Sequence, residues 1–250
     1  MTRPTPVAGL RGTGDVWYKL EYARIYMAQL KKRERCAMVQ QGQDLNRIIL
    51  RGCVAGKTQL SHRSHEEGFY RFPLAVERLS GNEDVLNILF SERLLPPKEL
   101  VEGTRVEVRG SLRTFNNKSG VGAKLVITVL AQEIVPTTDD HINDLKLAGT
   151  ICRLGGSRRT PLGREICDFT LAVNRRYGRS DYLPCIAWGS MAQRCAAMEV
   201  GQRLHLDGRL QSRVYTKQLG DHSEERVAFE CSAMSLEAEA DSRELCSAYQ

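Results

Sequence analysis

The sequence predicts an all-β protein with two small closed barrels in tandem, preceded by one amphipathic helix. Three observations predict this fold. Landmark residues recur at an offset of 97 to 98 positions, apolar and polar residues alternate inside the repeated segments, and each copy has one helix slot after its third strand. A chain of 250 residues is also long enough for two domains of about 100 residues each.

Three motifs occur twice in the same order, with one residue of drift between the second and the third. They are an Asn-x3-Leu-x-Gly motif, a Leu-Ala-Val motif and a Gly-x-Leu motif, which begin at Asn46 and Asn143, at Leu74 and Leu171, and at Gly110 and Gly208. Matched landmarks in one order indicate two copies of a single small domain.

The N-terminal region differs from both copies. Residues 1–14 are rich in Pro, Gly and Thr, a composition that favours disorder. From Asp15 onward, apolar residues recur every three or four positions, which is the period of an amphipathic helix. We expect this helix over residues 15–40, with Asp15 able to cap it.

The first copy spans residues 45–136, and its strands are expected at 48–53, 69–78, 84–90, 105–112 and 124–129. Two prolines, Pro96 and Pro97, interrupt its helix slot, so this helix must be short or kinked. Residues 137–140 are the best linker. The second copy spans residues 143–239, and residues 240–250 form a C-terminal tail.

The second copy shows the clearer pattern. Apolar residues at every second position predict half-buried strands, and residues 190–198 are rich in helix formers and end before Gly201. The order is β-β-β-α-β-β in about 95 residues. Short strands with one helix after the third suit a closed barrel of the oligonucleotide-binding (OB) type, so the predicted fold class is all-β with two tandem OB-fold barrels and an N-terminal α-helix.

The third strand of the second copy carries the most informative face. Alternation directs Leu183, Cys185 and Ala187 into the barrel and Tyr182 and Trp188 outward. Aromatic rings beside Arg and Lys are what a single-stranded nucleic-acid groove needs, since bases stack on rings and cations neutralise phosphates. Burial of both rings at a barrel or subunit interface is the alternative. Two further rings, Tyr177 and Tyr215, are expected in the neighbouring hairpins.

Positive charge is concentrated in the same copy. Residues 153–179 hold seven arginines against Glu165 and Asp168, although the whole chain has a formal net charge of only +6. A solvated hairpin region and a phosphate-binding surface are both compatible with this cluster. The candidate phosphate contacts are Arg158, Arg159, Arg175, Arg176, Arg213 and Lys217.

Together these segments resemble the bacterial single-stranded-DNA-binding protein family. The motifs that carry the resemblance are Asn143-x3-Leu147-x-Gly149, Arg159-Thr-Pro-x-Gly163, Phe169-Thr-Leu-Ala-Val173, Asp181-Tyr-Leu-Pro-Cys-Ile-Ala-Trp-Gly189, Val200-Gly201 and Gly208-Arg-Leu-Gln-Ser-Arg-Val-Tyr215. The resemblance implies an OB fold that stacks bases on Tyr182, Trp188 and Tyr215, with Tyr177 as an approximate fourth position. The chain is also similar to primosomal replication protein N.

The chain departs from that family in two ways. It ends without the family's acidic Pro-Phe tip, which puts recruitment of partners by that route in doubt. It also carries two barrels where most members carry one, so a homodimer with four OB folds is expected. The first copy has Val85 and Asn117 where Tyr182 and Tyr215 would be, and we expect this barrel to be mainly structural or dimerising.

The leading hypothesis is a non-enzymatic protein that binds single-stranded DNA in replication, repair or recombination. A primosome-type adaptor that contacts other replication proteins, and a protein for single-stranded RNA, are the alternatives. No phosphate-cradling loop, nucleophile elbow or paired metal ligands are present, so neither catalysis nor a cofactor nor a metal is expected. The eight scattered cysteines suggest reduced thiols, and we expect a cytoplasmic, nucleoid-associated protein with no membrane segment.

Overall fold

The computed structural model describes residues 44–117, 123–219 and 222–239, with only the backbone described for Lys217, Leu219 and His222. The predictions for residues 1–14, for the helix at 15–40 and for the tail at 240–250 lie outside the described residues. Within the described part, no helix is long and apolar enough to cross a membrane.

Barrel 1 is formed by the strands of residues 45–136. Its sheet closes in the order β1-β3-β4-β6-β5-β1, with β4 and β6 parallel and the other pairs antiparallel. This order is that of a five-stranded OB barrel. The elements are β1 (Leu45–Val54), β2 (Gln59–Ser64), β3 (Glu67–Glu77), β4 (Glu83–Ser91), η1 (Pro97–Glu99), β5 (Arg105–Asn116) and β6 (Leu125–Pro136).

Two local features of barrel 1 follow from its sequence. The helix slot holds only the short 3₁₀ turn η1, as expected where Pro96 and Pro97 stand together. The polar segment around His62, which was not among the predicted strands, contains strand β2, which pairs with β3. All but the last residue of β2 is exposed, so no apolar alternation marked it as a strand.

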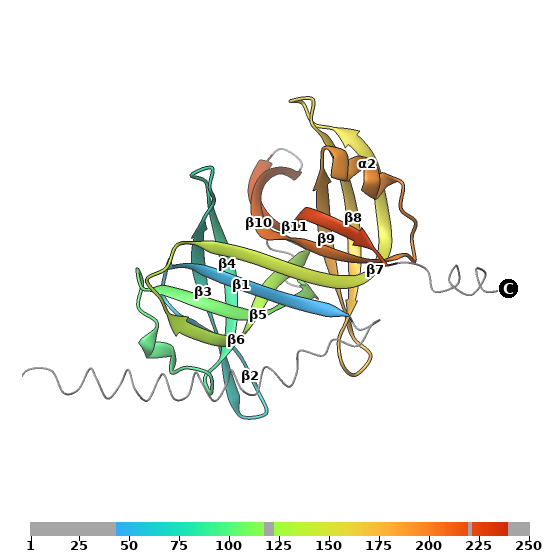
Figure 1. Ribbon diagram of the computed structural model, residues 1–250. Coiled ribbons are helices and arrows are strands. Elements are labelled where there is room, and N and C mark those ends of the chain that lie inside the picture. The colour runs from blue at the N-terminus through green and yellow to red at the C-terminus, as the bar shows by residue number, and fades with distance from the viewer. Residues whose placement is uncertain (1–43, 118–122, 220–221, 240–250) are drawn as a thin grey trace, which may run out of the picture. The chain divides into compact units, whose positions relative to one another are not determined.

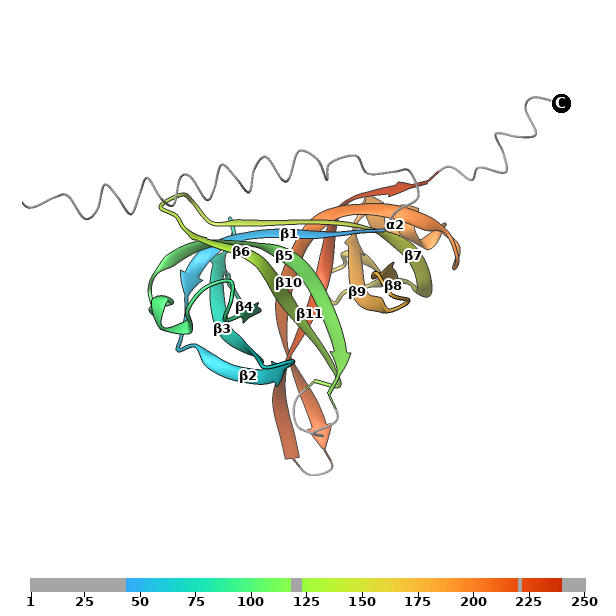
Figure 2. The same cartoon turned by 90° about the horizontal axis from the view of Figure 1, so that it is seen from below.

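Barrel 2 repeats the same closure with β7-β8-β9-β11-β10-β7 (Figure 1). The predicted helix after the third strand is present as α2. The β10–β11 hairpin stays paired far beyond the barrel, out to Leu219 and His222 (Figure 2). The elements are β7 (Ile142–Arg159), β8 (Glu165–Asn174), β9 (Ser180–Trp188), α2 (Ser190–Ala196), β10 (Arg203–Leu219) and β11 (His222–Ala238).

Each barrel encloses an apolar core built from the inward face of its strands. The predicted inward residues of β9, Leu183, Cys185 and Ala187, are all buried. Burial and the neighbouring Cys167 thiol raise the pKa of Cys195 to about 12, so this thiol stays protonated at neutral pH. The cysteines of the described residues are free thiols, as the sequence predicted.

The first repeated motif has a steric cause at its glycine. A Cβ on Gly52 would lie 2.2 Å from the carbonyl oxygen of Ala75, and a Cβ on Gly149 would lie 2.4 Å from that of Ala172. Real Cβ atoms do not approach oxygen so closely. The glycine therefore recurs because β1 crosses β3 in close contact in barrel 1, and β7 crosses β8 in the same way in barrel 2.

The asparagine of the same motif completes a sheet edge. The side chain of Asn46 bonds both the N–H and the C=O of Leu112, at 2.7 and 2.9 Å. Asn143 does the same to Leu210, at 3.0 and 2.7 Å. In barrel 1 the backbone pairing of β1 with β5 begins at Ile48, two residues after Asn46. The amide of Asn46 therefore extends this ladder by one step.

The two barrels pair through β1 and β7, which lie side by side and antiparallel (Figure 1). Ile48 lies opposite Leu145, and Leu145 is the residue that stands 97 positions after Ile48. Because 97 is the repeat offset itself, each strand meets its own copy at this point. The barrels are therefore related by a pseudo-twofold axis that passes between Ile48 and Leu145.

A buried carboxylate from each barrel binds the other barrel. Asp84 of β4 pairs with Arg78 at 2.6 Å and accepts bonds from the N–H and hydroxyl of Ser212 in barrel 2, at 2.7 and 2.9 Å. Burial alone would raise the pKa of Asp84, but the hydrogen bonds from Arg78 and Ser212 hold it below its ordinary value.

The second junction is the symmetric copy of the first. Asp181 of β9 pairs with Arg175 and accepts a bond from the N–H of Thr114 in barrel 1 at 2.7 Å. Asp181 and Arg175 stand 97 residues after Asp84 and Arg78. We name these contacts the Asp84 junction and the Asp181 junction.

Candidate nucleic-acid interface

The outer face of β9 is partly open and partly covered. Tyr182 at one end of the strand has 53% of its surface exposed, whereas Ile186 is buried. Trp188 at the other end is half-buried. Both rings point outward as predicted, but only one of them lies in a groove.

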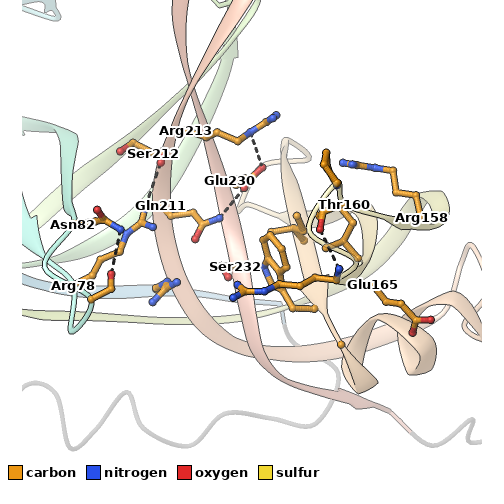
Figure 3. A pocket seen from close by; sticks show the side chains of 18 of the residues that line it. Arg78, Asn82, Arg158, Thr160, Glu165, Gln211, Ser212, Arg213, Glu230 and Ser232 are labelled. Atoms are coloured by element: carbon orange, nitrogen blue, oxygen red, sulfur yellow. Dashed lines mark hydrogen bonds and ion pairs between the residues drawn. The ribbon is translucent and has the colours of Figure 1, made fainter.

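That groove lies between barrel 2 and barrel 1 and has a volume of about 1050 Å³. Figure 3 shows Arg78 and Asn82 of barrel 1 on one side and Arg158 and Thr160 of barrel 2 on the other. Trp188 also lines the space, which we call the Trp188 groove. An indole and several guanidinium groups therefore share one open cavity.

A second groove of about 470 Å³ continues across the same face. It shares Arg158 and Arg213 with the Trp188 groove and is lined by Tyr215 and, from barrel 1, Lys124. The guanidinium of Arg213 lies 5.9 Å from the centre of the Tyr215 ring, within the range of a cation–π contact. We call this the Tyr215 groove. The two grooves adjoin at Arg158 and Arg213, and we call them together the track, which has one ring in each half.

Ion pairs with carboxylates partly neutralise the positive charge of this track. Arg158 pairs with Asp168 at 2.7 Å, Arg159 with Glu165 at 3.2 Å, and Arg213 with Glu230 at 3.8 Å. These arginines are more than half exposed, and an exposed ion pair contributes at most about 1 kcal/mol. A phosphate can therefore replace such a carboxylate at little cost.

Two of the predicted rings lie outside both grooves. Tyr182 is six residues from Trp188 along β9, a distance of roughly 20 Å at the rise of a strand. Its backbone N–H donates to Thr114 of barrel 1 at 3.1 Å. Tyr177 is 98% exposed in the β8–β9 turn, with φ at +69°. The four predicted rings thus form two groups, one in the track and one beside the Asp181 junction.

The predicted cations also divide. Arg158 and Arg213 line the track, and Arg159 lies beside it, paired with Glu165. Arg175 is held in the Asp181 junction, an arrangement that gives it a structural role. Arg176 is exposed in the β8–β9 turn, and the side chain of Lys217 is not among those described.

Three arginines of the Trp188 groove were not predicted from the sequence: Arg78, Arg164 and Arg209. Arg209 sits between Gly208 and Leu210 of a repeated motif, so outward alternation on β10 could have indicated it. Arg78 comes from the other barrel, more than 100 residues earlier, and no local pattern places it here.

No cluster of three or more His, Cys, Asp or Glu side chains that could hold a metal ion is found among the described residues. The track is instead an aromatic and cationic surface. Such a surface can stack planar rings and neutralise anions.

Comparisons with known proteins find similar sequences over barrel 2. Residues 142–237 match the model of the single-strand binding protein family. Single-stranded DNA-binding protein A of Bacillus subtilis is 34% identical over 86 residues, which are 32% of this chain and 50% of that protein. The single-stranded DNA-binding protein of Halalkalibacterium halodurans is 33% identical over 95 residues, 35% of this chain and 54% of that protein.

The chain spans about half the length of these curated relatives. The fold of both barrels is shared with the single-stranded DNA binding protein from Thermus aquaticus, which aligns with a TM-score of 0.66 and 21% identity over 80% of this chain and 95% of that one. The fold is therefore two tandem OB barrels. The match to the single-strand binding protein family model spans residues 142–237, the part of the chain that carries the motifs resembling that family.

Proposed function

We propose that this protein binds single-stranded DNA without sequence preference and without catalysing a reaction. The observation that carries the proposal is the Trp188 groove, where a half-buried indole faces a cavity lined by five arginines. The similarity of residues 142–237 to single-stranded DNA-binding proteins supports the same ligand.

The proposed mechanism combines stacking with neutralisation. Bases stack on Trp188 and Tyr215, with Tyr182 and Tyr177 as a second aromatic group farther along the barrel. Each stacked base contributes about 1–3 kcal/mol, and every base has a π-face, so the contacts do not select a sequence. Arg158, Arg159 and Arg213, with Arg176 and Lys217 as further candidates, neutralise phosphates along the track.

The proposed assembly is a homodimer with four barrels. Within one chain, β1 and β7 already join two barrels about a pseudo-twofold axis. Association of two chains would double this arrangement, and it would serve DNA replication, repair or recombination. Sedimentation equilibrium should give twice the 28.1 kDa chain mass.

A fluorescence titration tests the ligand. The chain has two tryptophans, Trp17 and Trp188, so the Trp17→Phe variant leaves Trp188 as the sole indole. Oligo(dT) should quench this fluorescence, and the affinity should fall steeply as salt rises, because phosphate binding releases counterions. Absence of both quenching and co-elution with oligo(dT) at low salt would overturn the proposal.

Two alternatives are separated by related measurements. Matched oligo(U) competes equally with oligo(dT) if stacking alone decides, and it wins if the ligand is RNA. A primosome-type adaptor would bind a helicase or primase through surfaces outside the track. Substitution of Trp188 would then leave that protein contact intact.

A further inference from the structure

One arginine of the Trp188 groove lacks the carboxylate partner that most of its neighbours have. Arg209 on β10 lies opposite Ser232 of β11 and is half-buried. Its Nε atom is buried without a hydrogen-bond partner among the described residues. Arg209 also lines the groove, so an anion bound there can neutralise its charge.

The charge around Arg209 favours an anion. Burial lowers the pKa of this guanidinium, the positive charge of Arg78 lowers it further, and Asp84 opposes the effect. Asp84 is already fully engaged, because its two oxygens accept from Arg78 and from Ser212. One positive charge at this junction is thus left without a hydrogen-bonded carboxylate.

The neighbourhood of Arg209 also provides further donors. Arg78 directs Nε and Nη2 at Asp84, so its Nη1 takes no part in those two bonds. Asn82 and Ser80 of barrel 1 line the same groove and are hydrogen-bonded to each other at 3.3 Å. Guanidinium groups with amide and hydroxyl donors match the several acceptor oxygens of a phosphodiester.

We propose that Arg209 and Arg78 hold one phosphodiester of the bound strand at the Asp84 junction, so that the strand passes from Trp188 of barrel 2 onto barrel 1 beside Asn82. This inference rests on the proposed function and adds to it a defined crossing point between the barrels. The open track that joins the junction to Trp188 favours a polymer phosphate over an isolated small anion.

The pseudo-symmetric junction does not have this site. Gly110-Ser111-Leu112 is the first-barrel copy of Gly208-Arg209-Leu210, so a buried serine, Ser111, stands where Arg209 would be. The Asp181 junction keeps its arginine, Arg175, and its second cation, Arg113, is already ion-paired with Asp181 at 3.2 Å. The crossing therefore occurs at one junction of each chain, which fixes the point where the bound strand passes between the two barrels.

The test is the salt dependence of oligo(dT) binding by Arg209→Gln in the Trp17→Phe background. Glutamine keeps a hydrogen-bonding amide and removes the charge. We expect the slope of log affinity against log salt to fall in magnitude by about 0.7, the value for one phosphate contact on a single strand, with unchanged maximal quenching of Trp188. Arg209→Lys should restore the slope.

Lys98→Gln is the matched control, because Lys98 is exposed and lines neither groove of the track. Its slope should equal that of the parent. Equal slopes for Arg209→Gln and the parent, or equal losses for Arg209→Gln and Lys98→Gln, would overturn the crossing site. Failure of the parent itself to bind oligo(dT) would instead overturn the proposed function.

Discussion

At the level of Trp188, the two barrels carry an outer aromatic ring on different strands. In barrel 2, Trp188 of β9 lies opposite Ile166 of β8. In barrel 1, the matching position of β4 is Ser91, and it lies opposite Phe69 of β3. The ring of Phe69 stacks on His62, with centroids 4.9 Å apart and planes inclined by 2°. At the same level of the sheet, the ring of barrel 2 is on β9, whereas that of barrel 1 is on β3, the counterpart of β8.

Barrel 1 also keeps a groove, of about 460 Å³, on its outer face. Phe115, Arg71 and Arg113 line it, but Arg113 pairs with Asp181 at 3.2 Å. Arg113, whose counterpart in barrel 2 is Gln211, thus holds the barrels together, and Phe115 stands where barrel 2 has the track cation Arg213. The difference supports the prediction that barrel 1 is mainly structural or dimerising.

The junctions should give the largest effect. Asp84→Asn leaves Arg78 beside a neutral amide, and Asp181→Asn leaves Arg175 and Arg113 beside one. Loss of one partner of a buried ion pair costs about 3–5 kcal/mol. Urea unfolding should show similar losses of unfolding free energy for both variants, since the junctions are copies. Asp207→Asn removes an exposed pair with Lys146 and should cost less than about 1 kcal/mol. A large difference between the two junction variants would contradict their equivalence.

The Asp84 junction also has a pH signature. The pKa of Asp84 is lowered in the folded protein, whereas an unfolded aspartate titrates near roughly 3.9. The stabilisation is therefore present above about pH 4 and is lost as the pH falls through the folded pKa. Urea unfolding between pH 7 and pH 3 should show that the wild type loses its advantage over Asp84→Asn only at the acid end. A gap that stays constant over that range would contradict this.

Much of the fold was predictable because it depends on local periods. Strand alternation indicated the buried residues of β9, and the cluster of helix formers indicated α2. The exposed strand β2 was not predicted, because pairing with β3 stabilises it without an apolar face. Within the described residues, these elements rest on a pattern in their own segment, whereas β2 depends on a neighbouring strand.

Trp188 should carry the next largest effect, now on affinity. Trp188→Ala should weaken oligo(dT) binding by about 1–3 kcal/mol, the contribution of one stacked base. Ser91→Ala, at the matching position of barrel 1, should leave the affinity unchanged. Fluorescence anisotropy of a labelled oligomer measures both, and thermal melting shows whether each variant is folded. Equal losses would mean that the aromatic difference between the barrels does not govern binding.

The site was predictable only where a single strand defines it. Alternation placed Trp188 outward, but it could not show that Ile186 beside it is buried. Charge counting included Arg175 without the buried Asp181 that holds it, and it left out Arg78, which reaches the groove from the other barrel. Contacts between the barrels decide each of these cases, and no segment of sequence contains both sides of such a contact.

Phe115 should give the smallest effect and the sharpest view of barrel 1. Its ring is 51% exposed in the barrel 1 groove, so Phe115→Ala should change the free energy of unfolding by less than about 0.5 kcal/mol. If barrel 1 is mainly structural or dimerising, oligo(dT) affinity should also change by less than about twofold, or roughly 0.4 kcal/mol. Anisotropy titration beside Trp188→Ala makes the comparison. A loss as large as that of Trp188→Ala would mean that barrel 1 stacks bases with rings on other strands.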